Sequence, residues 1–287
     1  MEGEPILGNS QIEKNFFILG DERVLHTKAP EIFSAIMRKA GVNGTYKPFV
    51  IGPGKLSEAV KEIRTLNIAG ANVTTPYKEA IIPHLDELSE GATIIGSINT
   101  IVRNGNKLKG YNTNAIGFMD ALKDAGLDVA NKSALVFGTG GAARAVVFIL
   151  NWVHANPIFV TGRSQSKISA IVKQVGGEAI PFNMLPERPL SVYLVVNATS
   201  VSSPDEAPEL AKLVNRLQLP ICEMVIDLNY GRSRNFWQDM AQNKGIPFMD
   251  GLSSLANQAK RTFALWTGID VKPEVVVTAI QGSSSDI

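Results

Sequence analysis

The chain contains a single cysteine, Cys222, and only three histidines in its 287 residues. One cysteine cannot form an intrachain disulfide, and a metal cluster built on cysteines is excluded for the same reason. The histidines, His26, His84 and His154, show no mutual spacing that indicates a metal site. We therefore predict that no metal takes part in the function.

Long apolar runs and an excess of either charge are also missing. The longest apolar run, residues 145–150, is far too short to span a bilayer. The first 16 residues carry four charged side chains and lack the apolar core of a signal peptide. The net charge is +1, and lysine and arginine are scattered along the chain. We expect a cytoplasmic protein that binds neither membranes nor nucleic acids.

What the sequence does contain is a regular alternation of short apolar runs with helical patterns. This alternation is typical of α/β proteins with mostly parallel sheets, and 287 residues predict about two domains. Expected strands are 15–19, 46–51, 68–73, 133–137, 157–161, 191–196 and 224–228, and expected helices are 30–40, 56–66, 141–153, 167–175, 234–242, 251–266 and 272–280. We also expect a hairpin of 93–103 with 107–111, a polar loop at 202–208 and a disordered tail at 282–286.

Residues 70–78, Gly-Ala-Asn-Val-Thr-Thr-Pro-Tyr-Lys, are the most informative stretch. An apolar run ends there in two hydroxyls, a proline and a lysine, which indicates a buried strand that leads into a helix. Asn72, Thr74 and Lys78 would then lie at the carboxyl end of a strand, where open α/β sheets bind their ligands. A lysine in that place can exchange a proton with a bound carbonyl or hydroxyl, although a lone lysine is more often solvated.

A glycine-rich loop at residues 137–145, Phe-Gly-Thr-Gly-Gly-Ala-Ala-Arg-Ala, follows a predicted central strand and begins a helix. In this context glycines let the backbone approach a pyrophosphate, which the helix N-terminus stabilises. A tight turn without a ligand is the alternative.

The end of the next predicted strand indicates which dinucleotide is bound. An NAD site usually has an acidic residue about 20 positions on, to bind the ribose hydroxyls. Residues 162–167, Gly-Arg-Ser-Gln-Ser-Lys, have no acid but two cations and two hydroxyls. Because a guanidinium binds phosphate with paired hydrogen bonds, Arg163, Ser164 and Lys167 favour NADP. A solvated basic turn at a helix start is the alternative.

Seven motifs, in order along nearly the whole chain, resemble those of the shikimate dehydrogenase family. They are Asn72-Val-Thr-Thr-Pro-Tyr-Lys78, Ser97-Ile-Asn99-Thr100, Gly110-Tyr-Asn-Thr-Asn114-Ala-Ile-Gly117-Phe118, the glycine-rich loop, Asn197-Ala-Thr-Ser200, Asp227-Leu-Asn-Tyr230 and Gly251-Leu-Ser-Ser-Leu-Ala-Asn-Gln258. The resemblance implies NADP-dependent, reversible oxidation of shikimate, or of a close relative such as quinate, to the 3-keto compound. It also implies a substrate domain of residues 1–115 plus 252–287 and a Rossmann-type NADP domain of residues 116–251.

The resemblance assigns roles to individual residues. Lys78 would be the acid and base at the reacting oxygen, with Asn114 at the position of its usual partner. Substrate contacts would come from Thr27, Asn72, Thr74, Asn99, Tyr230 and Gln258. For the cofactor, the resemblance implies three groups of contacts. Gly138, Gly140, Gly141 and Ala142 would hold the pyrophosphate, and Arg163, Ser164 and Lys167 would face the 2′-phosphate. Asn197, Thr199, Leu228 and Gly251 would line the nicotinamide side.

Two departures from the family pattern affect this prediction. The family normally has aspartate where this chain has Asn114, so Lys78 lacks an ion-pair partner and its ammonium form is less favoured. The family usually has two serines that bind the substrate carboxylate, and here Thr27 keeps one hydroxyl whereas Ala29 has none. Loss of a donor to a buried carboxylate costs roughly 1–3 kcal/mol.

The departures leave three interpretations open. The first is an enzyme of reduced activity, because general acid–base steps contribute about 10²–10⁴ in rate. The second is a non-catalytic protein that binds a shikimate-like ligand and NADP in the same pocket. The third is another NADP enzyme with the same loop, which would not bind shikimate. The sequence is compatible with a monomer or a homodimer.

Overall fold

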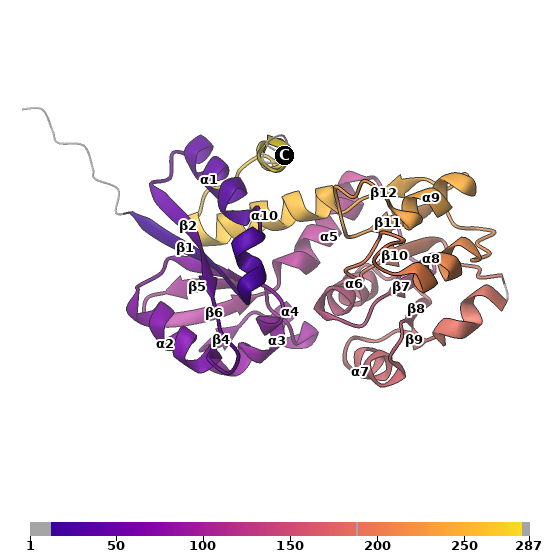
Figure 1. The fold of residues 1–287 in the computed structure, drawn as a ribbon, viewed down its shortest axis with the longest axis horizontal. Coiled ribbons are helices and arrows are strands. Elements are labelled where there is room, and N and C mark those ends of the chain that lie inside the picture. The colour runs from indigo at the N-terminus through magenta and orange to yellow at the C-terminus, as the bar shows by residue number, and fades with distance from the viewer. Residues whose placement is uncertain (1–12, 188, 283–287) are drawn as a thin grey trace, which may run out of the picture.

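The computed structural model describes residues 13–187 and 189–282, and it contains two six-stranded sheets. Figure 1 shows the first sheet, formed by the N-terminal part of the chain, beside the second, formed by the part that follows. The predicted α/β fold is confirmed. Residues 283–286 of the predicted tail lie outside the described residues, and Gly282 is the last residue of a helix.

The first sheet is mixed and has the strand order β2-β1-β3-β5-β6-β4. Its strands are β1 (Lys14–Gly20), β2 (Gly44–Val50), β3 (Gly70–Val73), β4 (Glu87–Leu88), β5 (Thr100–Asn104) and β6 (Lys107–Tyr111). The helical segments among them are η1 (Glu22–His26), α1 (Ala29–Ala40), α2 (Leu56–Thr65), α3 (Tyr77–Ala80), η2 (Ile82–His84) and α4 (Glu90–Ile95). Because β5 runs antiparallel to β3 and β6, the ends of β3 and β6 and the start of β5 meet at one edge.

The second sheet is parallel throughout and has the order β12-β11-β10-β7-β8-β9. Its strands are β7 (Ala134–Phe137), β8 (Ile158–Thr161), β9 (Glu178–Ala179), β10 (Leu194–Asn197), β11 (Met224–Asp227) and β12 (Phe248–Met249). Its helical segments are α6 (Gly141–Trp152), α7 (Gln165–Val175), η3 (Phe182–Glu187), α8 (Pro208–Asn215) and α9 (Phe236–Asn243). This 3-2-1-4-5-6 order is that of the Rossmann fold, with its ligand site expected where the order reverses beside β7.

Helix α10 (Leu252–Thr267) returns from the second sheet to the first, and α11 (Pro273–Gly282) follows it (Figure 1). Phe263 and Trp266 of α10 share a buried apolar cluster with Phe16 of β1. The rings of Trp266 and Phe16 stack at 4.8 Å, and Trp266 Nε1 donates to the Ile101 carbonyl at 2.9 Å. A Cβ at Gly70 would overlap the indole, so this close packing requires glycine there.

Helix α5 (Thr113–Asp124) crosses α10 at Gly117. A Cβ on Gly117 would lie 2.6 Å from the Ser254 carbonyl oxygen and 2.7 Å from the Gln258 nitrogen. Both are backbone atoms of α10, so a larger side chain at this position would require the whole helix to shift. The crossing therefore fixes the position of Gln258 relative to the first turn of α5.

The strand predicted at 93–103 is wrong in its first half. Helix α4 ends there, and β5 begins only at Thr100. Ser89 caps α4 by accepting a hydrogen bond from the Ala92 nitrogen at 3.3 Å, and Gly96 ends it in the left-handed region at φ 64°. Capping and burial of one helical face thus outweigh the β-branched side chains of this stretch.

The other predicted helices agree with the structure within two residues at each end, and the other predicted strands within three. Helices α5 and α8 were not predicted, and α8 begins at Pro208, the last residue of the predicted loop. Within residues 13–187 and 189–282, no helix is both long and apolar enough to cross a membrane.

Gly117→Ala will lower the free energy of unfolding by about 1–3 kcal/mol, the usual cost of overpacking. The matched control is Gly91→Ala in α4, where the nearest atom would lie 3.8 Å from the added Cβ. Alanine in a helix is favoured over glycine by about 0.5–1 kcal/mol, so the control should be neutral or stabilising. Urea unfolding compares the two, and equal effects would contradict the close crossing.

Candidate active site

Polar side chains from three elements meet at the edge where β3 ends and β5 begins. Asn72, the third residue of β3, is buried and accepts a hydrogen bond from Tyr46 Oη at 2.8 Å. Its Nδ2 donates to the Asn99 carbonyl at 3.0 Å. The amide of Asn72 is therefore held by protein groups on both sides, which fixes its orientation.

Asn99 forms the centre of this group. Its Oδ1 accepts from the Thr113 nitrogen at 2.7 Å, and its Nδ2 donates to Thr113 Oγ1 and to Asn114 Oδ1, each at 2.9 Å. The side chain is only 4% exposed. One buried amide thus binds the start of α5 to the start of β5 and orients Asn114.

Helix α10 joins the group through Thr262. Its hydroxyl lies 2.9 Å from Thr113 Oγ1 and 3.1 Å from Thr100 Oγ1, and Gln258 Nε2 donates to it at 3.1 Å. The structure therefore brings together Asn72, Asn99, Asn114 and Gln258, all predicted site residues. Thr113 and Thr262 were not predicted; the spacing of Thr262 four residues after Gln258 is the signal that indicates a shared helix face.

Lys78 lies on the short helix α3, next to the same edge. Its carbonyl accepts a hydrogen bond from the Ile98 nitrogen at 2.9 Å, which places α3 beside the segment that carries Asn99. The side chain is partly buried, and burial lowers the pKa of Lys78 to about 8. Among the described residues no carboxylate lies within ion-pair distance of its amine. Lys78 is therefore a lysine that can gain or lose a proton near neutral pH.

Thr27 and Thr74 line a pocket of about 210 Å³ at the ends of β1 and β3. Thr27 follows η1, and its Oγ1 accepts from the Ala29 nitrogen at 3.3 Å. The Thr74 nitrogen donates to the Leu19 carbonyl at 2.9 Å, which holds the segment after β3 against β1. The two predicted substrate residues therefore share one pocket wall.

Tyr230 lies elsewhere, after β11, where it lines a second pocket of about 440 Å³ with Asn235, Gln238 and Asp250. It also packs against the apolar cluster of the first sheet. Burial raises the pKa of Tyr230, so its phenol stays protonated. The structure does not place Tyr230 in the pocket of Thr27 and Thr74.

The glycine-rich loop between β7 and α6 is closely packed. Gly138 has φ 132°, and a Cβ there would lie 2.8 Å from the Ala198 carbonyl oxygen. A Cβ on Gly141 would lie 2.6 Å from Ser97 Oγ of the first unit. Gly140 precedes α6, and no side chain caps the helix. The first N–H groups of α6 are therefore available to an anion, and the loop fits a pyrophosphate.

Arg163, Ser164 and Lys167 lie after β8, the strand beside β7. Arg163 and Lys167 are exposed, and neither forms an ion pair within the described part of the chain. Ser164 Oγ lies 3.2 Å from Ser166 Oγ. This exposed group of two cations and two hydroxyls suits an added phosphate on the adenosine ribose.

The predicted nicotinamide-side residues are held by Asp227, a role that the sequence did not indicate. This fully buried carboxylate accepts from Asn197 Nδ2 at 2.8 Å, Ser202 Oγ at 2.6 Å, Asn229 Nδ2 at 2.9 Å and Asn235 Nδ2 at 2.7 Å. It therefore joins the loops after β10 and β11.

Contacts within these loops position the other residues predicted for the nicotinamide side. Asn197 Oδ1 accepts from Thr199 Oγ1 at 2.7 Å, and the Leu228 nitrogen donates to the Asn197 carbonyl at 3.0 Å. A Cβ on Gly251 would overlap the backbone of Leu228. The structure thus brings Asn197, Thr199, Leu228 and Gly251 close together.

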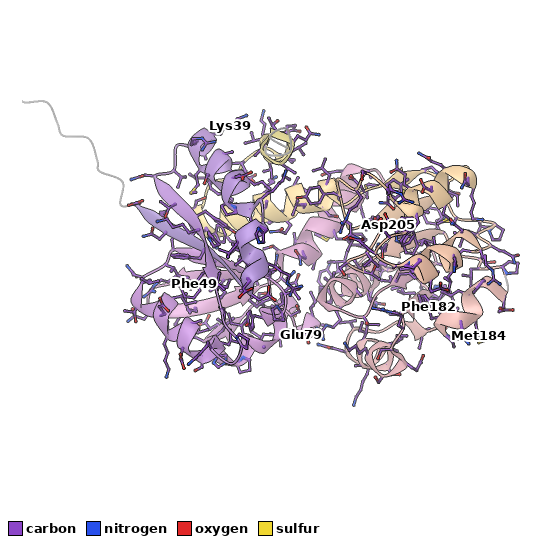
Figure 2. All side chains as sticks on the ribbon, in the orientation of Figure 1. Lys39, Phe49, Glu79, Phe182, Met184 and Asp205 are labelled. Carbon is purple, nitrogen blue, oxygen red and sulfur yellow. The ribbon has the colours of Figure 1, made fainter. Side chains whose placement is uncertain are left out.

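An ion pair joins the two units directly beside Lys78. Arg144 of α6 pairs with Glu79 of α3; the Arg144 side chain is 14% exposed and that of Glu79 57% exposed. Figure 2 shows Glu79 between the two halves of the molecule. The pair connects the helix after the glycine-rich loop with the helix that carries Lys78. Neither residue was predicted, because a single charge on a helix gives no signal of its partner.

Asp227→Asn will lower the free energy of unfolding by about 2–4 kcal/mol. The amide NH₂ of asparagine cannot accept hydrogen bonds, so some of the buried donors that now bind Asp227 would be left without an acceptor. The control is Asp205→Asn, which removes an exposed ion pair with Arg234 (Asp205 is labelled in Figure 2). Exposed pairs contribute about 0–1 kcal/mol. Urea unfolding measures both, and equal losses would contradict the role given to Asp227.

Several known proteins are similar to this chain. Residues 18–101 match the family model of the shikimate dehydrogenase substrate binding domain. A shikimate dehydrogenase (NADP(+)) of Desulforamulus reducens is 36% identical over 262 residues, 88% of this chain and 90% of that protein. The crystal structure of shikimate dehydrogenase from Aquifex aeolicus matches with a TM-score of 0.82 at 32% identity, over 95% of this chain and 99% of that one. Shikimate 5-dehydrogenase from Thermus thermophilus, in complex with NADP(H) and shikimate, has a TM-score of 0.82 at 32% identity, over 94% and 99% of the chains.

The fold and the site define a two-unit α/β protein in which a Rossmann-type sheet lies beside a sheet with a polar, lysine-bearing edge. At this identity and coverage, the chain belongs to the shikimate dehydrogenase family. The resemblance that the seven motifs carry is confirmed.

Proposed function

We propose that the protein is an NADP-dependent oxidoreductase that reversibly oxidises shikimate, or a close cyclitol carboxylate such as quinate, to the 3-keto compound. The observation that carries the proposal is the meeting of four amide side chains beside a lysine of lowered pKa. Amides both donate and accept hydrogen bonds, which suits a ring with several hydroxyls. The names of the relatives, shikimate dehydrogenase (NADP(+)), support the same reaction.

Lys78 is proposed as the acid and base. Its neutral amine would take the proton from the substrate hydroxyl during oxidation, and its ammonium would return a proton during reduction. NADP⁺, when bound, supplies the hydride acceptor. Asn99, Asn114 and Gln258 would orient the ring hydroxyls around the reacting carbon, with Asn72 and Thr74 at the neighbouring strand end. Tyr230, which lines the separate pocket after β11, would contact the substrate from the second unit.

The cofactor site is proposed in the second unit. Gly138, Gly140, Gly141 and Ala142 would hold the pyrophosphate, Arg163, Ser164 and Lys167 the 2′-phosphate, and Asn197, Thr199, Leu228 and Gly251 the nicotinamide side. The uncapped start of α6 and the two exposed cations after β8 support this assignment.

We also propose that the cofactor domain spans residues 116–251 and that the rest of the chain forms the substrate domain. The first boundary then lies inside α5, whose Phe118 and Leu122 belong to the core of the second sheet. The second lies at Gly251, before α10 returns to the first sheet. A helix rather than a flexible linker thus joins the domains at the first boundary.

Asn114 supports a second candidate, a protein that binds shikimate and NADP with little or no turnover. Its Oδ1 accepts from Asn99 as a carboxylate oxygen would, but it places no negative charge near Lys78. The two candidates share one pocket and differ only in rate, so activity measurements separate them.

The rate of shikimate oxidation should rise with pH and level off above about 8. The working form for oxidation is the neutral amine, and burial lowers the pKa of Lys78 to about 8, so the base is lost as pH falls below that value. Reduction of the ketone needs the ammonium and should instead decline above about 8. Initial rates between about pH 6 and 10, in both directions, check the two opposite slopes; parallel slopes would contradict a proton-transfer role for Lys78.

Asn114→Asp should raise kcat for shikimate oxidation on the order of 10-fold, within the range of acid–base contributions. A carboxylate near the amine favours its charged form, so the pKa of Lys78 and the pH profile should move upward. NADP reduction, measured at the optimum pH of each protein, gives the comparison. Asn131→Asp, which adds the same charge at an exposed turn, is the control and should leave the rate unchanged.

The same measurements decide between the candidates. A large gain with unchanged shikimate affinity supports an enzyme with an impaired proton-transfer pair. Tight binding of shikimate without turnover in either protein supports the non-catalytic candidate. No binding of shikimate or quinate by either protein would contradict both and favour another NADP-dependent reaction.

A further inference from the structure

The pocket of about 210 Å³ contains a cation that the motifs did not indicate. Its lining residues are Ile18, Arg23, Val24, Thr27, Thr74 and Thr75. Arg23 is the only one with a charge, and three of the others carry hydroxyls. We propose that Arg23 determines substrate specificity by binding the carboxylate of the substrate together with the hydroxyls of Thr27 and Thr74; this rests on the proposed function.

The pocket lies on the same face of the first sheet as the amide group. Ile18 of β1 pairs in register with Asn72 of β3, so their side chains share a face. Thr74 follows Asn72 by two residues and continues along that face, since side chains alternate along a strand. A ring held at one end by Asn99 and Asn114 can therefore direct its opposite end toward Thr74 and Arg23.

Asp21 holds the Arg23 guanidinium in place. Arg23 Nε donates to Asp21 Oδ1 at 2.8 Å and Nη2 donates to Asp21 Oδ2 at 2.7 Å, while the Arg23 backbone nitrogen donates to Oδ1 at 3.2 Å. This side-on pair uses one edge of the guanidinium. Within the described part of the chain, Nη1 has no hydrogen-bond partner, and the side chain is 68% exposed. The free edge is thus fixed in advance and accessible, which lowers the entropy lost on binding.

The hydroxyls supply the other donors. Thr27 Oγ1 accepts from the Ala29 nitrogen, so its own hydrogen remains free to donate. No hydrogen bond occupies the Thr74 hydroxyl in the described residues. A guanidinium edge and two hydroxyls match a carboxylate, which has two oxygens and accepts only. The methyl group of Ala29 offers no hydrogen-bond donor. Arg23, as the one charged residue that lines the pocket, is therefore the strongest donor available to a carboxylate there.

The test compares shikimate with its uncharged methyl ester, in the wild type and in Arg23→Gln. Removing a charge-assisted hydrogen bond should weaken shikimate binding roughly 10- to 100-fold. The ester should bind both proteins within about 2-fold, because it has no carboxylate for Arg23 to bind. The KM for NADP should not change, and kcat should fall less than KM for shikimate rises. Arg38→Gln, which removes an exposed arginine of α1, is the control and should alter neither affinity.

Three outcomes are decisive. Unchanged shikimate affinity in Arg23→Gln, with wild-type turnover intact, overturns the role of Arg23 and leaves the proposed function standing. Equal loss for the acid and the ester also overturns it, because Arg23 would then act on the shape of the pocket. A wild type that binds neither compound contradicts the proposed function and the role of Arg23 with it.

Discussion

The site depends on one buried amide, that of Asn99. Its side chain binds the start of α5 through Thr113 and orients Asn114, and its backbone carbonyl accepts from Asn72. Thr262 adds α10 to the same hydrogen-bond group. Because a buried amide must satisfy both its donors and its acceptor, its partners are held in a single arrangement. Strands β3 and β5 and helices α5 and α10, distant in sequence, thereby present their polar groups at one edge.

Lys78 has a different environment from these amides. Neighbouring protein groups desolvate its amine and lower its pKa to about 8, and no carboxylate of the described residues pairs with it. The neighbouring Glu79 forms its ion pair with Arg144 of the second unit and not with Lys78. The lysine can thus be neutral or charged near pH 8, which suits the acid and base role proposed for it.

The sequence predicts most of the fold and of the site, since apolar runs, glycines and ordered motifs are local signals. It predicts that Asn99, Asn114 and Gln258 belong to one site. It does not predict Thr113 or Thr262, because the hydrogen bonds that make them important join residues 149 positions apart. The roles of Asp227, Arg144 and Arg23 are not predicted either, because several of the residues around them are also distant in the sequence. The helix at α4 is missed because its cap and its buried face outweigh local strand preference.

The most direct test of the account follows the hydrogen that leaves the substrate. Shikimate carrying deuterium at ring carbon 3 would be incubated with the wild-type protein and NADP⁺, and the products examined by proton NMR and mass spectrometry. Under the proposed hydride transfer, the deuterium appears on carbon 4 of the nicotinamide ring, with one 3-keto product for each NADPH formed. Release of the deuterium to water, or its retention in shikimate that is bound but not oxidised, would contradict hydride transfer at this site.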